Sequence, residues 1–360
     1  MIRAYISQVV QGENLSPEEM TEAMELILRN KVRPTQAAAL LVGLRLKGET
    51  RSEIAAAARV MRRYMPRIRV PAGAVVLDRD EINLDEETVA KTCSLVGGET
   101  RTFNVSTATA LVAAGGGLPV AKFGSRAEST FCGSANVISA LGVNLDLTLT
   151  EVERCVKQVG LGFLYAKLFH SPLARVTQIR EEIGIRTIFN LIGPLSNPAG
   201  GESQVLGVYL SERTELMAQV LSDLGCRSAM VVCGQDTLDE LSNTGPTRIT
   251  RLVNGAIDTF DLIPEEVGLR RAAPEEISGG GAEQNAKIIR EILEGQPGAR
   301  RDVVLLNAAA AFMAAGRTAS WADGLELAAQ SIDSGQAKAK LDQLIAFTAV
   351  CGVYQHKDVS

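Results

Sequence analysis

The sequence predicts an α/β protein with a small, mostly helical N-terminal domain and a larger α/β domain built on a mainly parallel central sheet. Apolar residues follow helical spacing through the first part of the chain, to about residue 70. From Gly73 onward, short β-rich runs alternate with helical patterns, as in a parallel sheet covered by helices. The length of 360 residues indicates roughly two domains. We expect the helical domain over 1–70 and the α/β domain over 71–149 and 184–360.

Two capping motifs mark where helices begin in the first domain. The stretch 16–19 (SPEE) lets the side chains of Ser and the second Glu bond each other's backbone N–H groups, with Pro at the first helical position. The stretch 50–53 (TRSE) repeats this pattern before an Ala-rich helix that ends near Tyr64. The segment 149–183 is also apolar with a helical pattern. We expect about 150–183 to fold back onto the N-terminal helices and complete their domain.

The α/β domain has its own order of elements. Strands are expected at 74–77, 119–122, 204–210 and 229–233, and helices at 106–114, 133–141 and 211–224. Asn254 and Gly255 separate two β-rich runs and form a strong hairpin signal, so the sheet gains an antiparallel addition at 247–253 and 256–260. Helical patterns return at 284–293, 303–315, 321–334 and 336–347.

Composition excludes several classes of protein. The apolar runs are broken well before about 18 residues, so no membrane-spanning helix is expected. The N-terminus lacks the pattern of a signal peptide, and we expect a cytoplasmic protein. The net charge of −5 argues against a nucleic-acid partner. A basic cluster, more often a solvated face than a ligand site, comprises Arg62, Arg63, Arg67 and Arg69.

Cysteine and histidine chemistry is not expected in this chain. The six cysteines show no C-x-x-C pair and no metal-ligand spacing, so we expect reduced and mostly buried thiols. Cys132 differs in lying within a loop that has other candidate binding residues. The two histidines leave few candidates for a His-centred triad. We assign no catalytic acid, base or nucleophile.

The segment 122–142 concentrates groups that bind phosphate. Lys122 and Arg126 lie four residues apart, Gly124 and Gly133 mark turns, and Ser134 can open a helix. The first N–H groups of a helix are unpaired and carry partial positive charge, so a helix start receives phosphate readily. A basic residue and an Arg fork beside it make an anion cradle.

The stretch 102–107 (TFNVST) comes before a second predicted helix. Asn104 or Ser106 can cap that helix, and the same groups can face a phosphate or its metal; the sequence leaves both readings open. If the two helix starts follow adjacent parallel strands, they converge on one crevice. Open α/β sheets bind their ligands in such a crevice.

Two further groups are candidates for ligand chemistry. Asp239 and Glu240 are adjacent carboxylates on a loop before the hairpin, and Mg²⁺ is bound by one or two carboxylates plus substrate phosphates. The alternative interpretation is that Asp239 and Glu240 are a solvated acidic pair without a metal. Arg180 stands near the seam between the helical and sheet parts and could clamp a carboxylate. The alternative interpretation is that Arg180 forms an ion pair on the surface with Glu181 or Glu182.

Six motifs then occur in a fixed order: TFNVSTATALVAAGGGLPVAKFGSR, GSANVISALGV, GLGFLYAKLFHSPL, GIRTIFNLIGPLSNP, LDELSNTGPT and LLNAAAAF. In this order they resemble the anthranilate phosphoribosyltransferase family, from the first helices nearly to the C-terminus. The resemblance implies a fold shared with the nucleoside phosphorylases and a homodimer formed through the helical domain. It also implies transfer of phosphoribosyl from phosphoribosyl diphosphate (PRPP) to anthranilate with Mg²⁺, a step of tryptophan biosynthesis.

The resemblance also implies roles for individual residues. PRPP would be bound by Gly97, Gly98, Asn104, Ser106, Thr107, Lys122, Gly133 and Ser134. The acceptor would be bound by Phe123, Ser125 and Arg180, and the metal by Ser106, Asp239 and Glu240. The transition state of such a displacement resembles an oxocarbenium ion, so the protein acts mainly by positioning and by stabilising the leaving diphosphate.

The chain departs from the family at two loops. The family's Gly-Thr-Gly-Gly-Asp-Gly aligns without a gap to 94–99 (SLVGGE), with one glycine in register; a one-residue deletion instead aligns Gly97-Gly98-Glu99 with Gly-Gly-Asp. In both registers Leu95 and Val96 bring side chains to positions that phosphate approaches. The family's Lys-His-Gly-Asn-Arg reads KFGSR, with Phe123 and Ser125 in place of His and Asn. The alternatives are therefore a transferase for another aromatic or nucleobase acceptor, and a paralogue without catalysis that binds a ligand or nucleic acid.

Overall fold

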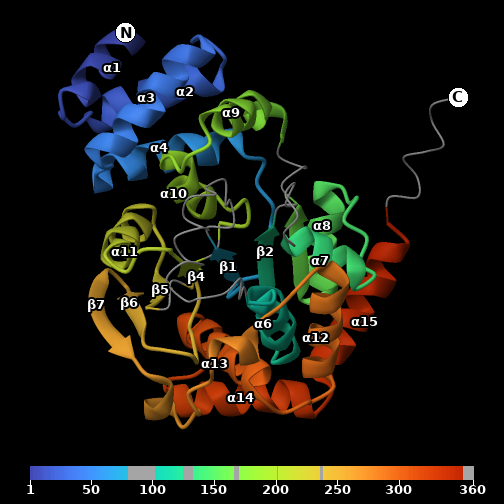
Figure 1. Ribbon diagram of the computed structural model, residues 1–360. Coiled ribbons are helices and arrows are strands. Elements are labelled where there is room, and N and C mark those ends of the chain that lie inside the picture. The colour runs from blue at the N-terminus through green and yellow to red at the C-terminus, as the bar shows by residue number, and fades with distance from the viewer. Residues whose placement is uncertain (80–101, 125–132, 166–169, 201, 236–237, 352–360) are drawn as a thin grey trace, which may run out of the picture.

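Seven strands form one sheet in the order β3-β2-β1-β4-β5-β6-β7 in this computed structural model, which describes residues 1–79, 102–124, 133–165, 170–200, 202–235 and 238–351 (Figure 1). The first five strands in this order are parallel, and β6 and β7 are antiparallel additions. The bounds are β1 Val75–Arg79, β2 Val120–Gly124, β3 Leu161–Tyr165, β4 Ser203–Gly207, β5 Ser228–Gly234, β6 Thr247–Val253 and β7 Ala256–Leu262. The predicted α/β class and the predicted hairpin at Asn254-Gly255 are confirmed.

Four helices make the N-terminal bundle: α1 Ile2–Val10, α2 Pro17–Leu28, α3 Pro34–Lys47 and α4 Arg51–Tyr64. Both predicted capping boxes are present, because the Ser16 and Thr50 side chains each accept a bond from the backbone N–H three residues later. A matched cap contributes about 1 kcal/mol to a helix. The bundle sits above the sheet, and its helix α4 packs on α10 and α11 of the larger part (Figure 1).

Among the described residues, the remaining α-helices lie around the sheet, except α9, which packs on α2 and α3. They are α6 Val105–Gly115, α7 Ser134–Ala140, α8 Leu149–Val159, α9 His170–Ile183, α10 Ile188–Leu195, α11 Arg213–Asp223, α12 Ala282–Leu293, α13 Ala299–Ala314, α14 Trp321–Asp333 and α15 Gln336–Ala349. The predicted helices begin or end within a few residues of these bounds. The predicted strand 204–210 is shorter than expected and ends at Gly207.

The sheet separates two hydrophobic cores, because side chains alternate between the faces of a strand. Val76, Leu206 and Val231 point into a first core that includes the N-terminal bundle, α10 and α11. Val75 and Val232 point into a second core with α6 and α13. Burying one such aliphatic side chain stabilises the fold by about 2 kcal/mol, so both faces of the sheet are firmly held.

The expectation of a helical segment over 149–183 is wrong in its middle. Helix α8 ends at Val159, its C-cap Gly160 adopts the left-handed conformation, and the next residues form β3 beside β2. A short apolar run does not distinguish a buried strand from a helix by periodicity, which is why the pattern misled. Helix α9 packs on α2 and α3, whereas α8 packs on β3 and α15. The division of the chain into domains near 150 and 183 stays a prediction.

Arginines of α4 tie the bundle to the α/β part. Arg62 donates from Nε to the Leu195 carbonyl at 2.7 Å and from Nη1 to the Leu224 carbonyl at 3.1 Å. Arg51 forms a two-bond ion pair with Asp223 at 2.7 and 2.6 Å. The expectation that the basic cluster is a solvated face is therefore wrong for Arg62, while Arg63 is exposed and pairs with Glu25.

Other expectations concern membranes and thiols. Among the described residues, no helix has the length and apolar character needed to cross a membrane. Cys155, Cys226, Cys233 and Cys351 are free and buried, as predicted, and Cys93 and Cys132 lie outside the described residues. Burial raises the pKa of Cys155 to about 12 and that of Cys226 to about 11, so these two thiols are not poised as nucleophiles.

Candidate functional site

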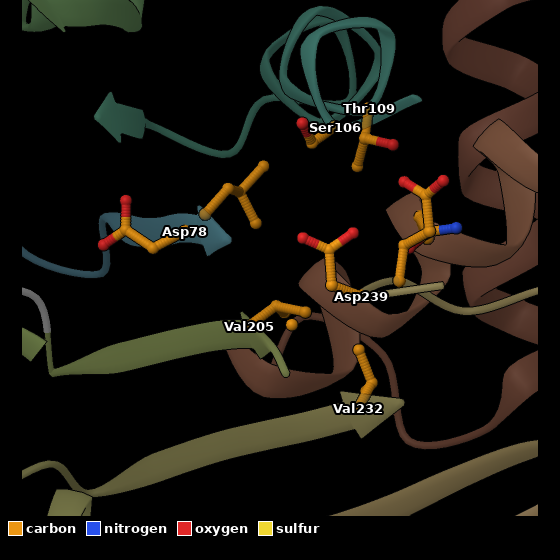
Figure 2. Close-up of a pocket in the computed structure, with 10 residues that line it drawn as sticks. Asp78, Ser106, Thr109, Val205, Val232 and Asp239 are labelled. Atoms are coloured by element: carbon orange, nitrogen blue, oxygen red, sulfur yellow. The ribbon is translucent and has the colours of Figure 1, made fainter. Parts of the chain in front are cut away.

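A small pocket opens at the carboxyl ends of β1, β4 and β5, where parallel strands commonly bind ligands (Figure 2). Its volume is about 30 Å³, enough for a water molecule or an ion. It is lined by Leu77, Asp78, Ser106, Thr109, Val205, Gly207, Val232, Asp239, Glu240 and Asn307. Three of these, Ser106, Asp239 and Glu240, are the residues expected to hold a metal.

The acidic pair lies in the loop that follows β5. The loop is fixed by backbone bonds from Gly234 N–H to the Leu238 carbonyl at 2.7 Å and from Gln235 N–H to the Pro246 carbonyl at 2.8 Å. Glu240 is buried, so the alternative of a solvated acidic pair is wrong for it. The Asp239 carboxylate points toward Ser106 and Thr109 at the start of α6 (Figure 2).

Two residues hold this loop against the rest of the domain. A Cβ atom on Gly207, at the end of β4, would lie 1.7 Å from the Asp239 carbonyl oxygen, so the loop can approach β4 only where the residue lacks a side chain. Asn307 of α13 bonds both backbone groups of Leu241: Oδ1 accepts from the N–H at 3.1 Å and Nδ2 donates to the carbonyl at 2.8 Å. The acid pair is therefore positioned from β4 and from α13.

The start of α6 supplies the opposite wall of the pocket. Ser106 lies in the first turn of the helix and Thr109 follows one turn later, and both line the pocket. Asn104 occupies the N-cap position, but its side chain makes no capping bond. Thr107 is buried and is not among the lining residues. The structure thus brings Ser106 to the acidic pair and leaves Thr107 outside the pocket.

Two lining residues, Asp78 and Asn307, and the Asn197 side chain that bonds Asp78, were not predicted from the sequence. Asp78 is buried near the end of β1 and accepts bonds from Asn197 Nδ2 at 3.2 and 3.0 Å. Its carboxylate points away from Ser106 and Thr109, in contrast to that of Asp239 (Figure 2). An acidic residue directly after the apolar run of β1 was the available signal for Asp78. Its bond to a residue 119 positions away left no local trace.

Three residues expected to bind phosphate have clear positions. Lys122 is fully buried on β2, in register with Leu77 of β1 and Phe163 of β3. Lysine is rarely fully buried unless its ammonium group is paired. Gly133 is the N-cap of α7 and Ser134 is its buried first residue. None of these three lines the pocket at β1, β4 and β5.

Arg180 is placed between the bundle and the sheet, as its position in the sequence indicated. It lies on α9, is buried, and donates from Nη2 to the Asn190 side-chain oxygen at 3.3 Å. Its guanidinium also lies 5.8 Å from the centre of the Phe189 ring. This burial contradicts the alternative of an ion pair on the surface. The Asn190 oxygen also accepts from the Thr187 N–H at 3.0 Å and so joins Arg180 to the start of α10.

Several predicted site residues lie outside the described part of the chain. Gly97, Gly98 and Ser125 fall in undescribed segments, and only the backbone of Phe123 is described, opposite Leu164 in β3. The predictions for these four residues stay predictions.

The donor set in the pocket fits a magnesium ion bound together with a phosphate ligand. Among the described residues, no group of three His, Cys, Asp or Glu side chains could hold a metal by itself. Mg²⁺ does not require such a cage, because it keeps waters and uses one or two carboxylates plus substrate phosphates. Asp239, Glu240 and the Ser106 hydroxyl supply oxygen donors of this kind in one pocket.

Comparison with known families divides the chain in two. Residues 3–65 match the helical bundle domain of the glycosyl transferase family. Residues 86–338 match the a/b domain of the same family.

Individual proteins match over nearly the whole length. The chain is 47% identical over 348 residues to an anthranilate phosphoribosyltransferase of Geotalea uraniireducens, covering 97% of this chain and 99% of that protein. It is 48% identical to that of Syntrophotalea carbinolica, with the same shares covered.

Solved structures match as well. The crystal structure of anthranilate phosphoribosyltransferase from Thermus thermophilus has a TM-score of 0.85 and 40% identity, over 96% of this chain and 99% of that chain. The Saccharomyces cerevisiae enzyme in complex with PRPP and Mg has a TM-score of 0.84 and 26% identity, over 97% of this chain and 98% of that chain.

Proposed function

Because this chain belongs to the anthranilate phosphoribosyltransferase family, we propose that it transfers the phosphoribosyl group of PRPP to anthranilate with Mg²⁺. The observation that carries this proposal is the convergence of Ser106, Asp239 and Glu240 in one pocket at the carboxyl ends of parallel strands. A relative of the same fold is known in complex with PRPP and Mg. The product would enter tryptophan biosynthesis.

The reaction exchanges one bond for another at C1 of the ribose. The anthranilate nitrogen forms a bond to C1, the bond from C1 to the diphosphate oxygen breaks with its electron pair leaving on the diphosphate, and the amine loses a proton to solvent. Mg²⁺, held by Ser106, Asp239 and Glu240, would neutralise charge on the leaving diphosphate. The phosphates of PRPP would be bound by Asn104, Lys122, Gly133 and Ser134. Gly97 and Gly98 are proposed to bind the same phosphates. The protein thus acts by positioning and by charge stabilisation.

Arg180 is proposed to receive the carboxylate of anthranilate. Its guanidinium is held by Asn190 and lies against Phe189, so it is oriented before the acceptor arrives. Oriented Arg forks bind carboxylates through paired, charge-assisted bonds. Phe123 and Ser125 would lie beside the ring of the acceptor.

Replacing Arg180 with Gln is expected to raise KM for anthranilate by roughly ten- to a hundredfold, the range for losing charge-assisted hydrogen bonds. The affinity for PRPP should stay within about twofold, because the substitution leaves the groups at the start of α6 and after β5 in place. Steady-state kinetics with each substrate varied in turn provide the measurement. Arg154→Gln is the matched control, because Arg154 lies over Phe347 rather than at the seam. Equal loss of affinity for both substrates would contradict the acceptor role.

We also propose that the protein is a cytoplasmic homodimer that associates through its helical domain. Val10 and Leu46 are large apolar residues that are 70% and 82% exposed on α1 and α3. These helices pack on each other, and a Cβ on Gly43 of α3 would contact Val9 and Val10 of α1. Exposed apolar residues that gather on one face are typical of an interface. Sedimentation of the wild type and of a Leu46→Asp variant tests this assignment, and a monomeric wild type would exclude it.

A second candidate function is favoured by the sequence departures at 94–99 and at Phe123 and Ser125. A transferase for a different aromatic or nucleobase acceptor explains the changes beside the acceptor, whereas a paralogue without catalysis explains the changed phosphate loop. Turnover of anthranilate distinguishes the proposed function from a transferase with a different acceptor. Binding of PRPP distinguishes the proposed function from a paralogue without catalysis.

Calorimetric titration of PRPP with and without Mg²⁺ tests the proposed function. Metal-dependent binding in the micromolar range followed by anthranilate turnover would support it. No binding up to millimolar PRPP would exclude it and favour the non-catalytic paralogue. Binding without turnover of anthranilate would favour a different acceptor.

Restoring the loop as Leu95→Thr with Val96→Gly is expected to strengthen PRPP binding, because both changes remove apolar bulk where a phosphate approaches. The same titration provides the measurement. A weaker affinity in this variant would mean that the loop is built for another ligand.

A further inference from the structure

Asn104 and Asn285 form a contact between residues 181 positions apart, next to the candidate site. From it we infer that Asn285 is a positioning residue that fixes which way the Asn104 amide faces. The inference rests on the proposed function, because it assigns Asn104 a donor role toward a phosphate of PRPP. Nothing in the local sequence of either residue indicates the pair.

The first observation is that Asn104 occupies an N-cap position but its side chain does not cap the helix. Asn at an N-cap normally accepts a bond from a backbone N–H in the first turn of the helix. Here Asn104 is the N-cap of α6 without a capping bond from its side chain. Its Oδ1 instead accepts from Asn285 Nδ2 at 3.0 Å. The side-chain oxygen of Asn104 is therefore bonded by a residue of α12 rather than by its own helix.

The second observation fixes the direction of both amides. The backbone N–H of Gly280 can only donate, and it donates to Asn285 at 2.7 Å, so the atom that receives it is the Asn285 oxygen. The other branch of the Asn285 amide is then the NH₂ group, which must donate. It follows that Asn104 turns its oxygen toward Asn285. The N–H donors of Asn104 lie on the opposite branch of its amide.

The third observation is that the backbone around this pair is held in place. Thr102 pairs with Ser278 in an antiparallel bridge, and the Phe103 N–H donates to the Ile277 carbonyl at 3.4 Å. A Cβ on Gly279 would lie 2.6 Å from the Phe103 Cα, so this approach requires glycine. Asn285 is 2% exposed in the first turn of α12. Its amide has little room to rotate.

The orientation of the Asn104 amide gives Asn104 and Ser106 different roles at the start of α6. An amide that presents N–H donors suits a phosphate oxygen and cannot ligate a metal through those donors. Ser106, two residues later, presents a hydroxyl to the pocket that contains Asp239. Asn104 is thereby assigned to the phosphate and Ser106 to the metal.

Asn285→Asp tests the orientation with a minimal change of shape. One oxygen of the new carboxylate still accepts from the Gly280 N–H, but the other now faces the Asn104 oxygen. The Asn104 amide should rotate by half a turn to donate to the carboxylate, and it then presents its oxygen where its N–H donors were. Asn144→Asp is the matched control, because that amide donates to the Thr348 and Cys351 carbonyls at the end of α15.

Two readouts separate the inference from the proposed function. In the protein without ligand, asparagine-selective ¹⁵N NMR follows the Asn104 side-chain amide, assigned by its loss in Asn104→Ala. This signal should shift in Asn285→Asp and stay in place in Asn144→Asp. Calorimetry should show PRPP affinity reduced roughly tenfold or more in Asn285→Asp, with no further loss when the change is made in the Asn104→Ala background.

An unmoved Asn104 signal would overturn the inference, and so would an equal loss of affinity in the Asn104→Ala background, because both show that Asn285 acts independently of Asn104. A wild-type protein that does not bind PRPP overturns the proposed function, and in that case the NMR shift decides the orientation by itself.

Discussion

Replacing Asp239 and Glu240 together with Ala is expected to abolish Mg²⁺-dependent PRPP binding, with a loss of roughly a hundredfold or more. Both carboxylates line the pocket with Ser106, so the double variant removes the acidic side chains that would hold the metal. The measurement is PRPP titration with and without Mg²⁺. The affinity that remains should no longer depend on the metal.

Controls distinguish loss of the metal site from loss of the fold. Asp239→Asn with Glu240→Gln removes the charges but keeps the shape, and it should lose the metal dependence as the Ala pair does. Glu265 and Glu266 form an adjacent acidic pair on the exposed turn Pro264–Val267, and their replacement with Ala should leave PRPP binding unchanged. Thermal unfolding should show that every variant folds. Unchanged Mg²⁺ dependence in the Asp239 and Glu240 variants would refute the metal assignment.

Gly207→Ala is expected to displace the acidic loop and to cost about 1–3 kcal/mol of stability, the range for overpacking a filled site. The new Cβ would meet the Asp239 carbonyl oxygen at 1.7 Å, and this oxygen belongs to the backbone and cannot rotate away. The loop must therefore move as a unit. We expect PRPP affinity in the presence of Mg²⁺ to fall by at least roughly tenfold, because the displaced loop no longer holds Asp239 and Glu240 in the geometry of the site.

Gly193→Ala is the matched control for this substitution. A Cβ on Gly193, within α10, meets no neighbouring atom within 4 Å, so its effect on stability and binding should be small. Urea unfolding gives the stability change and calorimetry the affinity. If Gly207→Ala binds PRPP and Mg²⁺ like the wild type, the contact between β4 and the loop does not position the acid pair.

The parts of the fold that were predictable from sequence depend on local signals. The capping boxes at Ser16 and Thr50 and the hairpin at Asn254-Gly255 are complete within a few residues. The alternation of strands and helices was enough to predict the parallel sheet. Strand β3 was missed because five residues of a buried run that follows a helix carry no periodicity of their own.

The site was predictable only in part, because local motifs can be read from the sequence whereas contacts between distant residues cannot. The Asp239-Glu240 pair and Ser106 stand in motifs that can be read directly from the chain. The partner of Asp78 is Asn197, and the partner of Asn104 is Asn285, and each pair is joined by folding rather than by sequence. Gly207 gave no signal, because what it accommodates is a backbone segment from another loop.

The packing of α9 has a consequence for how the two substrates meet. Arg180 is attached to a helix that packs on the N-terminal bundle, whereas Ser106 and Asp239 line the pocket at the sheet's carboxyl edge with α6 and β5. Under the proposed function, the amine and the ribose carbon are therefore carried by two different parts of the protein. The distance between them depends on how α4 rests on α10 and α11, through contacts such as those of Arg62, and on the bond from Arg180 to Asn190 of α10. A displacement of about 1 Å between reacting groups can cost a hundredfold in rate, so contacts of α4 such as those of Arg62, which touch neither substrate, influence the rate of the reaction.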